Sequence, residues 1–334
     1  MALASAKRAV GLELDTGAAR AVELSGTPQA AKLGAFASIE LPDGAVEEGM
    51  VVHPEAVGEA LKKLWDRGGF KSREVLLGVS NHGVMVRYAT MPKVPAEKLD
   101  NVIRFQAQEH LPIPLNSAVL DYLVIGETAT ESGAALEVLL VAAQRDMLTG
   151  FIEALNAARL ELIDIDVSTL ALMRIIPPDT LSSTVAVVNV ANGLSNILVA
   201  SQGSPRLARL VSVKLKDISE VLGCSLRDLF TGAVAGSEMM PTVMGAWTKN
   251  LATEIRSSIS YYQGQEGSAD VSEIFLNGPG GRLGGLAADL EDMLGIPVRV
   301  LPPLKRYGRK AGGEAEDTLD YAISTGLARR GLEG

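Results

Sequence analysis

One stretch near the end of the chain, residues 272–298, restricts the fold more than any other. It begins with an apolar run of β-forming residues at 274–276, which predicts a buried strand. The strand leads into NGPGG at 277–281, where glycines allow positive φ and close backbone approach. Leucines at helical spacing follow, and Gly295 with Pro297 ends the predicted helix. A strand, a glycine turn and a helix N-terminus at one point suit a phosphate or a nucleotide. The same kind of turn is also a common plain connection, and its spacing matches neither the dinucleotide fingerprint nor a P-loop.

The charge balance argues against a nucleic-acid partner. The 334 residues hold 31 Lys and Arg against 40 Asp and Glu, a formal net charge of −9. Aromatic residues make up only 4% of the chain, too few for a base-stacking surface, and there is no basic stripe. An apolar fraction of 47% is enough for a sizeable core, and the length indicates two domains or one two-lobed chain.

The few cysteine and histidine residues fit a reducing compartment. Cys224 stands alone, which excludes an internal disulfide, and three scattered histidines with one cysteine cannot form an ordinary structural zinc site. The start of the chain lacks the apolar core of a signal peptide, and the longest apolar run, at 136–143, is too short to span a bilayer. We expect a cytoplasmic protein that meets a membrane only through partners. No serine has a histidine in a recognisable relation to it, so we assign no catalytic residue.

Two strand–turn–strand patterns open the two halves of the chain. Apolar runs at 10–14 and 19–24 flank the turn DTGA and predict a β-hairpin. Runs at 184–190 and 196–201 flank a second turn in the same way. The sequences GLELDTGAARAVEL and AVVNVANGLSNILV agree in type and spacing, which indicates a weak internal duplication.

The remaining elements divide the chain into two lobes and an insertion. After the first hairpin, a third strand, a helix beginning at Pro54 and a fourth strand predict a mixed sheet covered by a helix. An order of strand, helix, strand, strand and helix then predicts a compact α+β unit, whose first helix ends at LPIP. The predicted units are 1–81 with 165–181 and 318–334 for the first lobe, 82–164 for the inserted subdomain, 182–214 with 271–317 for the second lobe, and 215–270 for a helical subdomain of the second lobe.

This layout resembles that of an actin-like ATPase. More specifically, the chain is similar to the PilM family of actin-like cytoplasmic proteins in type IV pilus assembly, themselves similar to the cell-division protein FtsA. The similarity rests on residues 10–24, 103–126, 251–263, 274–298 and 321–331, and so extends over nearly the whole chain. The second of these stretches is the most specific, because generic actin-like kinases lack its helix stop and Asp-Tyr strand. The resemblance implies an α/β, actin-like (ribonuclease H-like) two-lobed fold with an inserted small α+β subdomain.

The resemblance also implies a nucleotide site between the lobes, with ATP and Mg²⁺ as its ligands. In the family, the two hairpins clamp the phosphates from opposite lobes, and the glycine turn holds adenosine. The matching positions are Glu13, Asp15, Thr16, Gly17 and Arg20 in the first hairpin, Asn189, Asn192, Gly193 and Ser195 in the second, and Glu254, Gly278, Gly280, Gly281 and Arg282 on the adenosine side, with Glu13 and Asp15 as candidate metal ligands.

The phosphate side departs from the family pattern. The first acidic residues of the two hairpins are altered, to Glu13 and Asn189, and the glycines that approach phosphate are replaced. Asp15 in place of a glycine brings a carboxylate that repels phosphates unless Mg²⁺ lies between them. A shifted register, in which residues 15–17 supply the acid and the glycine, is an alternative that breaks the spacing to Arg20. Structural alternatives stay open as well: polar residues at the base of a turn for Glu13 and Asn189, and solvated charges for Arg20 and Glu254.

The function implied by the resemblance is that of a cytoplasmic scaffold in a type IV pilus or related secretion machine. PilM-like proteins bind the N-terminal cytoplasmic tail of the inner-membrane protein PilN, in a groove between the inserted subdomain and its lobe. ATP in the cleft would act as a conformational ligand with slow or no hydrolysis. We place the groove at the apolar residues Ile113, Leu115 and Val119. Other pilus inner-membrane and motor components are implied as partners, and self-association is left open.

Two other functions remain alternatives. An active ATPase or sugar kinase on the same fold needs a carboxylate base and an intact phosphate clamp, against which Asn189 and Ala191 speak. An FtsA-like filament former carries a membrane-binding amphipathic helix, and we find no basic amphipathic extension after the last predicted helix, at 319–329.

Overall fold

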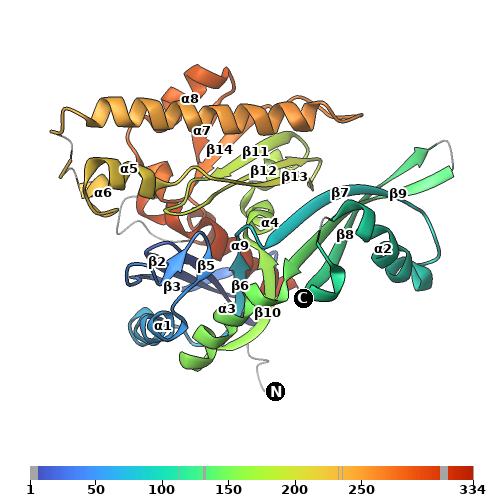
Figure 1. Cartoon of the computed structure of the whole chain (residues 1–334), viewed down its shortest axis with the longest axis horizontal. Helices are drawn as coiled ribbons and strands as arrows, with labels where there is room; N and C mark the ends of the chain where they lie inside the picture. The colour runs from blue at the N-terminus through green and yellow to red at the C-terminus, as the bar shows by residue number, and fades with distance from the viewer. Residues whose placement is uncertain are drawn as a thin grey trace.

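The computed structural model describes residues 7–111, 113–130, 133–231, 233–234, 236–308 and 315–333. Its strands form two five-stranded sheets, one three-stranded sheet and a two-stranded ribbon. Figure 1 shows the two large sheets one above the other, with the three-stranded sheet projecting to the right. Helices pack against all three sheets, so the expectation of a two-lobed α/β fold is confirmed.

The first large sheet contains the predicted N-terminal hairpin. Its strands, in spatial order, are β10 (Glu161–Val167), β6 (Glu74–Val79), β1 (Arg8–Asp15), β2 (Ala18–Ser25) and β3 (Lys32–Glu40), and the ribbon β4 (Val46–Glu47) and β5 (Met50–Val51) follows. β1 pairs antiparallel with β2, so that Glu13 lies opposite Arg20. β6 and β10 extend the sheet in parallel on the other side. β1 is buried along almost its whole length because both faces of this central strand are covered.

One face of this sheet is covered by α1 (Pro54–Gly68) and α3 (Arg145–Ala157). Leu61 of α1 and Phe151 of α3 belong to one buried apolar cluster. Gly58 lets the two helices approach closely, since a Cβ at this position would lie 2.5 Å from the Cβ of Ala157. Pro54 stands in the first turn of α1, as predicted.

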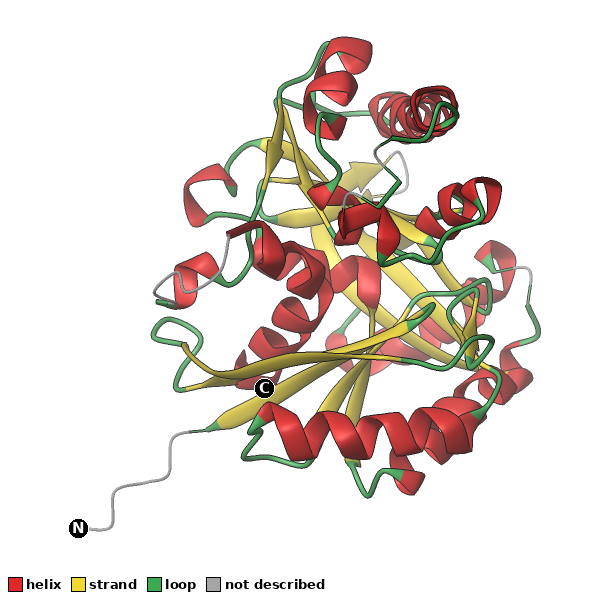
Figure 2. Cartoon of the chain, turned by 90° about the vertical axis from the view of Figure 1, so that its left-hand side faces the viewer, coloured by secondary structure: helices red, strands yellow, loops and turns green. Residues whose placement is uncertain are grey.

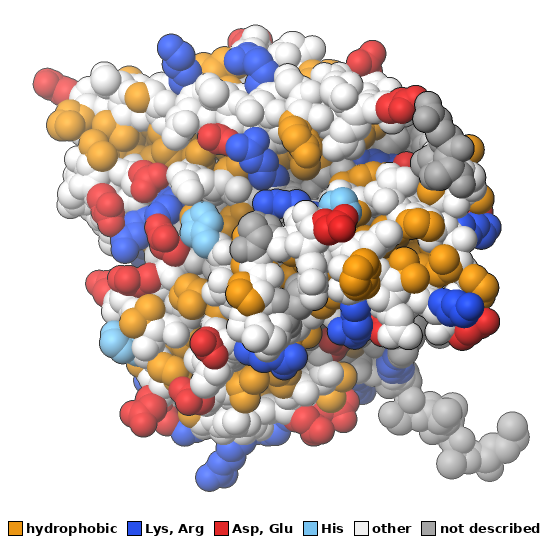
Figure 3. Space-filling view, turned by 45° about the vertical axis from the view of Figure 1, so that its right-hand side comes forward, with side chains coloured by type: hydrophobic (Ala, Val, Ile, Leu, Met, Phe, Trp, Pro, Cys, Tyr) orange, Lys and Arg blue, Asp and Glu red, His pale blue; other side chains and the backbone are white. Residues whose placement is uncertain are grey.

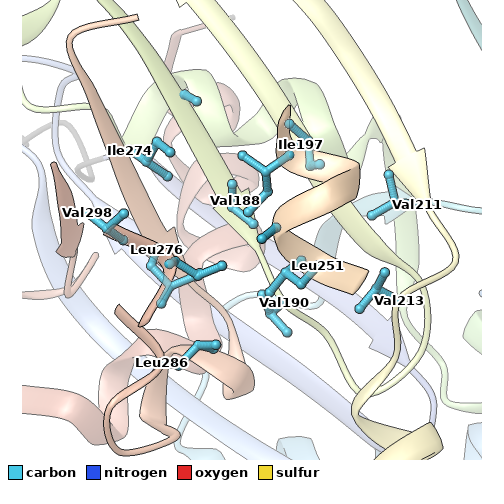
Figure 4. Close-up of a cluster of buried hydrophobic side chains, with 14 of the residues drawn as sticks. Val188, Val190, Ile197, Val211, Val213, Leu251, Ile274, Leu276, Leu286 and Val298 are labelled. Atoms are coloured by element: carbon cyan, nitrogen blue, oxygen red, sulfur yellow. The ribbon is translucent and has the colours of Figure 1, made fainter. Parts of the chain in front are cut away.

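The second large sheet contains the predicted second hairpin. Its strands, in spatial order, are β13 (Ser204–Val211), β12 (Ser195–Ser201), β11 (Thr184–Asn189), β14 (Glu273–Asn277) and β15 (Val298–Val300). Its covering helices are α5 (Leu215–Leu222), α6 (Asp228–Thr231), α7 (Met240–Gln263) and α8 (Leu286–Leu294). Val188 and Ile197 from the sheet meet Leu251 of α7 and Leu286 of α8 in one apolar cluster (Figure 4). The helical character predicted for residues 215–270 is confirmed.

The inserted unit is a three-stranded antiparallel sheet with one helix on it. The sheet has the order β7 (Val84–Pro92), β9 (Gly133–Gln144) and β8 (Ala118–Thr130), and α2 (Ala96–His110) buries Ile103 and Ala107 against it. The expected unit, 82–164, also included α3 and the first four residues of β10. The structure packs α3 on α1 and pairs β10 with β6 in the first large sheet. We therefore propose 84–144 as the inserted unit.

Two helices, α4 (Ser168–Ala171) and α9 (Ala322–Glu333), lie between the large sheets. Their apolar cluster includes Leu24 from the first sheet and Val187 from the second, so the lobes share a core. The approach of α9 to β1 is close, because a Cβ on Gly11 would lie 2.1 Å from the carbonyl oxygen of Ser324. In the side view of Figure 2, helices occupy the centre of the molecule between strands above and below.

The glycine-rich stretch folds as strand, turn and helix, but the turn and the helix are separate. Pro279–Arg282 form a 3₁₀ turn, and α8 begins only at Leu286. The prediction that a helix N-terminus lies at the glycine turn is therefore wrong. Leu283 is extended and buried. Gly284 and Gly285, the latter with φ 85°, are non-helical, so α8 cannot begin before Leu286. Gly295 ends α8 in the left-handed conformation, as expected.

Candidate functional site

The two hairpin turns meet at the face where the lobes oppose each other. β1 ends at Asp15 and β11 ends at Asn189, and each strand lies inside its own sheet. The carboxyl ends of such strands are where α/β sheets place ligand sites. Gly17 adopts φ 72°, which gives the two-residue turn after β1 its tight shape.

Asp15 connects the two turns. One of its carboxylate oxygens accepts hydrogen bonds from the backbone N–H groups of Thr16 (2.7 Å) and Gly193 (3.0 Å). The other accepts from the backbone N–H of Asn192 (3.0 Å) and from the Arg20 guanidinium (3.1 Å). The Asn192 side chain adds a bond in the other direction, since its Nδ2 donates to the carbonyl of Thr16 at 3.0 Å. Two successive N–H groups of the second lobe thus bind an anion of the first lobe.

Arg20 is a buried ion-pair partner and no solvated strand residue. It is 2% exposed, and its Nη1 lies 3.1 Å from Asp15 and 3.7 Å from Glu13. Burial raises the pKa of Glu13 to about 8, although Arg20 lowers that pKa and the carboxylates of Asp15 and Asp320 raise it. Glu13 is therefore mainly protonated at pH 7, and Arg20 faces one carboxylate and one carboxylic acid.

Asp320, in the 3₁₀ turn before α9, extends this cluster, although sequence reasoning missed it. Burial raises its pKa, and Arg20 and Arg282 lower it. Arg282 pairs with Asp320 at 3.4 Å and lies over the ring of Phe230, 4.7 Å from the centroid. Arg282 thereby joins the glycine turn to both α6 and the turn before α9.

A cavity of about 1020 Å³ lies beside the joined turns. Among the predicted site residues, Thr16, Gly17, Arg20, Asn192 and Arg282 line it. Further lining residues that the sequence did not single out include Lys216, Arg227, Phe230 and Asp320. Acidic side chains line the same wall, at Glu40, Asp43, Glu47 and Glu220, so the cavity carries charges of both signs.

The other predicted residues of the second hairpin have structural contacts. The Ser195 hydroxyl donates to the carbonyl of Val213 and accepts from the backbone N–H of Ala191. Asn189 is buried at the base of the turn, and its Nδ2 has no hydrogen-bond partner among the described residues. Asn189 thus retains a buried, unused donor but does not line the cavity, while both hydrogen bonds of the Ser195 hydroxyl are to the backbone.

The glycines of the late turn are required by packing inside the second lobe. A Cβ on Gly278, whose φ is 77°, would lie 2.4 Å from the carbonyl oxygen of Val190. A Cβ on Gly280 would lie 2.2 Å from a methyl carbon of Val190, and one on Gly281 would lie 3.3 Å from Leu319. These three positions therefore face the protein itself, and of this turn it is Pro279 and Arg282 that line the cavity.

Glu254 lies away from the cleft. Its carboxylate pairs with Arg209 of β13 at 3.1 Å, and it is not among the residues that line the cavity. A role for Glu254 toward a ribose stays a prediction without a supporting contact.

The phosphate side does not fit the phosphates of a nucleotide in this arrangement. The N–H groups of Asn192 and Gly193, which would face a phosphate, already donate to Asp15. A Cβ on Gly193 would lie only 2.6 Å from the Thr16 hydroxyl, so the turns touch and leave no gap. Within the described part of the chain, no cluster of His, Cys, Asp and Glu has the arrangement of a metal site. The guanidinium of Arg20 pairs with the carboxylate of Asp15, and Glu13 is mainly protonated, so the Mg²⁺ role of these two candidate metal ligands stays a prediction.

The residues predicted for partner binding lie on the inserted unit. Ile113 is half-buried against its apolar cluster, and the Leu115 side chain lies outside the described residues, as does Pro112 of the helix stop. Val119 is 41% exposed and lines a second cavity of about 440 Å³ together with Arg104 and Arg145. Acidic and basic side chains are interspersed on the face turned forward in Figure 3, which shows no basic stripe there.

A second set of contacts joins the inserted unit to the second lobe. Arg206 of β13 donates to Glu137 of β9 at 2.8 Å and to the Tyr88 hydroxyl of β7 at 2.9 Å. Burial and the hydrogen bond with Glu137 raise the pKa of Tyr88 to about 12, so the phenol stays protonated. One arginine thus ties two strands of the insertion to the opposite lobe.

Two lobes with equivalent hairpins turned toward one cleft define the class of actin-like proteins. Within that class, the chain belongs to the family of the type IV pilus assembly protein PilM, because the family model matches residues 11–209, more than half of the chain. A solved PilM-PilN type IV pilus biogenesis complex is 25% identical, with a TM-score of 0.86 over 98% of this chain and 99% of that one.

More distant structures share the fold alone. The ethanolamine utilization protein EutJ of Carboxydothermus hydrogenoformans is 12% identical, with a TM-score of 0.57 over 96% of this chain and 89% of that one. MreB5 of Spiroplasma citri, solved with bound AMPPNP, is 10% identical, with a TM-score of 0.50 over 96% and 94% of the two chains. The fold thus occurs with a bound nucleotide analogue in a distant neighbour. Among the described helices of this chain, none has the length and apolar run needed to cross a bilayer.

Proposed function

We propose that this chain is a cytoplasmic scaffold of type IV pilus or related secretion machinery that binds the N-terminal tail of a PilN-like inner-membrane protein. The observation that carries the proposal is the free edge of β8. β8 is the outermost strand of the order β7-β9-β8, and no strand among the described residues pairs with its outer edge. A free strand edge accepts an extended peptide through main-chain hydrogen bonds.

Apolar side chains stand exposed along this edge strand. Val119 is 41% and Leu123 is 48% exposed, and with Asp121 between them they alternate onto one face of β8. The intervening Leu120 and Tyr122 pack on the cluster under α2. An extended tail with apolar residues at alternate positions therefore matches the exposed face of β8.

Charges lie at the start and in the middle of this apolar strip. Arg330 of α9 pairs with Asp164 of β10 at 2.6 Å; burial lowers the pKa of Arg330, but the carboxylates of Asp166, Asp164 and, on β8, Asp121 raise it. β8 therefore runs close to the end of α9 and to β10, as Figure 1 also indicates. At the start of β8, Arg104 and Arg145 line the smaller cavity, where they suit carboxylate or carbonyl groups of a tail.

Binding of a synthetic tail peptide tests the proposal. The peptide carries the N-terminal tail of a PilN-like protein from the same organism, and fluorescence anisotropy reports its affinity. Val119→Lys is expected to weaken binding by about tenfold or more, because the ammonium replaces an apolar contact. The matched control is Val221→Lys, since Val221 is 58% exposed on α5, remote from β8. Equal affinities of the two variants would contradict the proposal.

A double substitution tests the apolar residues that precede β8 in the sequence. Ile113→Asp with Leu115→Asp is expected to abolish tail binding while the thermal unfolding temperature stays close to that of the natural chain. Loss of the folded state would leave the Val119→Lys comparison as the deciding measurement. Other pilus inner-membrane and motor components, and self-association, stay predictions for pull-down and sedimentation measurements.

The proposed role places the protein at the inner membrane through its partner. ATP is proposed to bind only when the cleft opens, because the closed cleft does not fit its phosphates. An active ATPase or kinase is the alternative function, and phosphate release from ATP separates the two. Turnover above the buffer rate would favour the enzyme over the scaffold.

A further inference from the structure

Asp15 occupies a complete anion site. Its two oxygens accept four hydrogen bonds, three from backbone N–H groups and one from a guanidinium. Asp15 is 7% exposed, and the bonds to Asn192 and Gly193 are buried. Successive N–H groups directed at one point form a concave site that binds phosphates and carboxylates alike.

The two successive N–H groups belong to the opposite lobe. Asn192 and Gly193 lie in the turn between β11 and β12 of the second sheet, whereas Asp15 ends β1 of the first. Each N–H carries one proton, and each points at an Asp15 oxygen at 3.0 Å. A phosphate oxygen can receive these bonds only after the Asp15 carboxylate has left.

The close approach of the two turns also excludes a phosphate from the site. The Cα of Gly193 lies so close to the first turn that a single added carbon would contact Thr16 at 2.6 Å and Asp15 at 3.2 Å. A phosphate group is larger than one carbon and carries more negative charge than the carboxylate it would replace. It therefore has to separate the turns before it can lie between them.

We propose that the Asp15 carboxylate is a built-in anion that holds the two lobes together, and that it excludes phosphate-bearing ligands from the turn of the second lobe. The bond set acts as a latch, by which we mean Asp15 with the N–H groups of Asn192 and Gly193. The latched cleft keeps its side cavity of about 1020 Å³, which leaves room for a ligand without phosphates. Phosphates and the latch compete for the same donors.

The natural chain alone can contradict this proposal. Calorimetric titrations with ATP and Mg²⁺ and with adenosine compare a ligand with and without phosphates. The latch predicts that the phosphates add no affinity, so ATP binds no more tightly than adenosine, or neither binds at millimolar concentration. ATP binding about a hundredfold tighter than adenosine would overturn the proposal, because it would require free donors in the turn.

A second experiment removes the Asp15 carboxylate and repeats the two titrations. Asp15→Gly is expected to raise the affinity for ATP by about tenfold or more and to leave that for adenosine unchanged, because only phosphates use the freed N–H groups. Asp15→Ala likewise removes both oxygens, and it serves where the glycine variant does not fold. Asp66→Asn, on an exposed part of α1, is the matched control and keeps the natural affinities. No gain in ATP affinity from either Asp15 variant, with folding verified by circular dichroism, would overturn the proposal.

The spacing between the lobes gives an independent readout. Pulsed electron–electron double resonance between spin labels on α1 and α5 should show one narrow distance distribution in the natural chain, unchanged by ATP. Asp15→Gly should broaden or lengthen it. An unchanged narrow distance in that variant would contradict the latch. Tail binding plays no part in these measurements, so this inference and the proposed function can fail separately.

Discussion

The two ends of the interlobe cleft are built in opposite ways. At one end, the carboxylate of Asp15 binds backbone N–H groups of the opposite turn, and Gly193 touches Thr16. At the other end, Arg282 lies on Phe230 and pairs with Asp320, and a cavity of about 1020 Å³ stays open. A short side chain that accepts hydrogen bonds from the opposite backbone closes a gap, whereas long side chains paired with residues of the wall leave one open.

The largest effect is expected at the late glycine turn, which forms the base of the open end. Gly278→Ala should lower the free energy of unfolding by roughly 2–4 kcal/mol, since a Cβ there meets a strained φ and a backbone carbonyl. Urea unfolding measures it. Gly284→Ala is the matched control, because nothing lies within 4 Å of a Cβ at this position. Equal stabilities of the two variants would mean that the turn can widen, and the contrast between the two ends would weaken.

The next effect is expected at the closed end. Asp15→Asn should cost roughly 1.5–3 kcal/mol, because an amide nitrogen in place of an oxygen leaves a buried donor facing another donor. The same urea unfolding experiment applies, with Asp66→Asn expected to stay within about 0.5 kcal/mol of the natural chain. A stable Asp15→Asn protein would show that the turns are held by contacts other than the carboxylate.

The pH dependence of stability tests the charge state of the closed end. Burial raises the pKa of Glu13 to about 8 from a usual 4.5. Between these two values the folded state binds more protons than the unfolded state, so stability falls as pH rises. The stabilising contribution is complete below pH 4.5 and is lost as pH rises through about 8. From pH 6 to pH 8 we expect a loss of about 2 kcal/mol, and Glu13→Gln should remove it. A Glu13→Gln protein with the same pH slope would assign the titration to another group.

The smallest effect is expected at the wall of the open end. Phe230→Leu removes the ring under Arg282 and should cost about 0.5–1 kcal/mol, the size of a partly exposed cation–π contact. Phe105→Leu is the control, since Phe105 is 74% exposed on α2. A larger loss at Phe230 would mean that the open end depends on this contact more than its exposure suggests.

The fold was largely predictable because its signals are local. Alternating and continuous apolar runs identified both hairpins, and Pro54 marked the start of α1. The start of α8 was also readable, since Gly284 and Gly285 stand directly after Leu283, although the helical spacing of the leucines favours an earlier start. The boundary of the insertion was not readable, because the apolar face of a helix does not say which surface will cover it.

The candidate site was less predictable, because its contacts join distant residues. The sequence identified Asp15 as an unfavourable replacement for glycine, but its partners Asn192 and Gly193 lie far along the chain. Arg20 could not be recognised as buried from the sequence, because its burial depends on the distant residues that cover this end of the hairpin. Asp320 carried no motif, and only the fold brings it to the first hairpin.

The contacts of Arg206 have a mechanical consequence. A tail held by a membrane protein would pull on β8, and β9 is the neighbouring strand through which the load passes inward. Arg206 bonds β9 and β7 to the second lobe by side chains alone, so it can pivot while the strands stay paired. Force applied to β8 would thus act on the second lobe through the Arg206 side chain, about which the inserted sheet can tilt, and not only along the backbone.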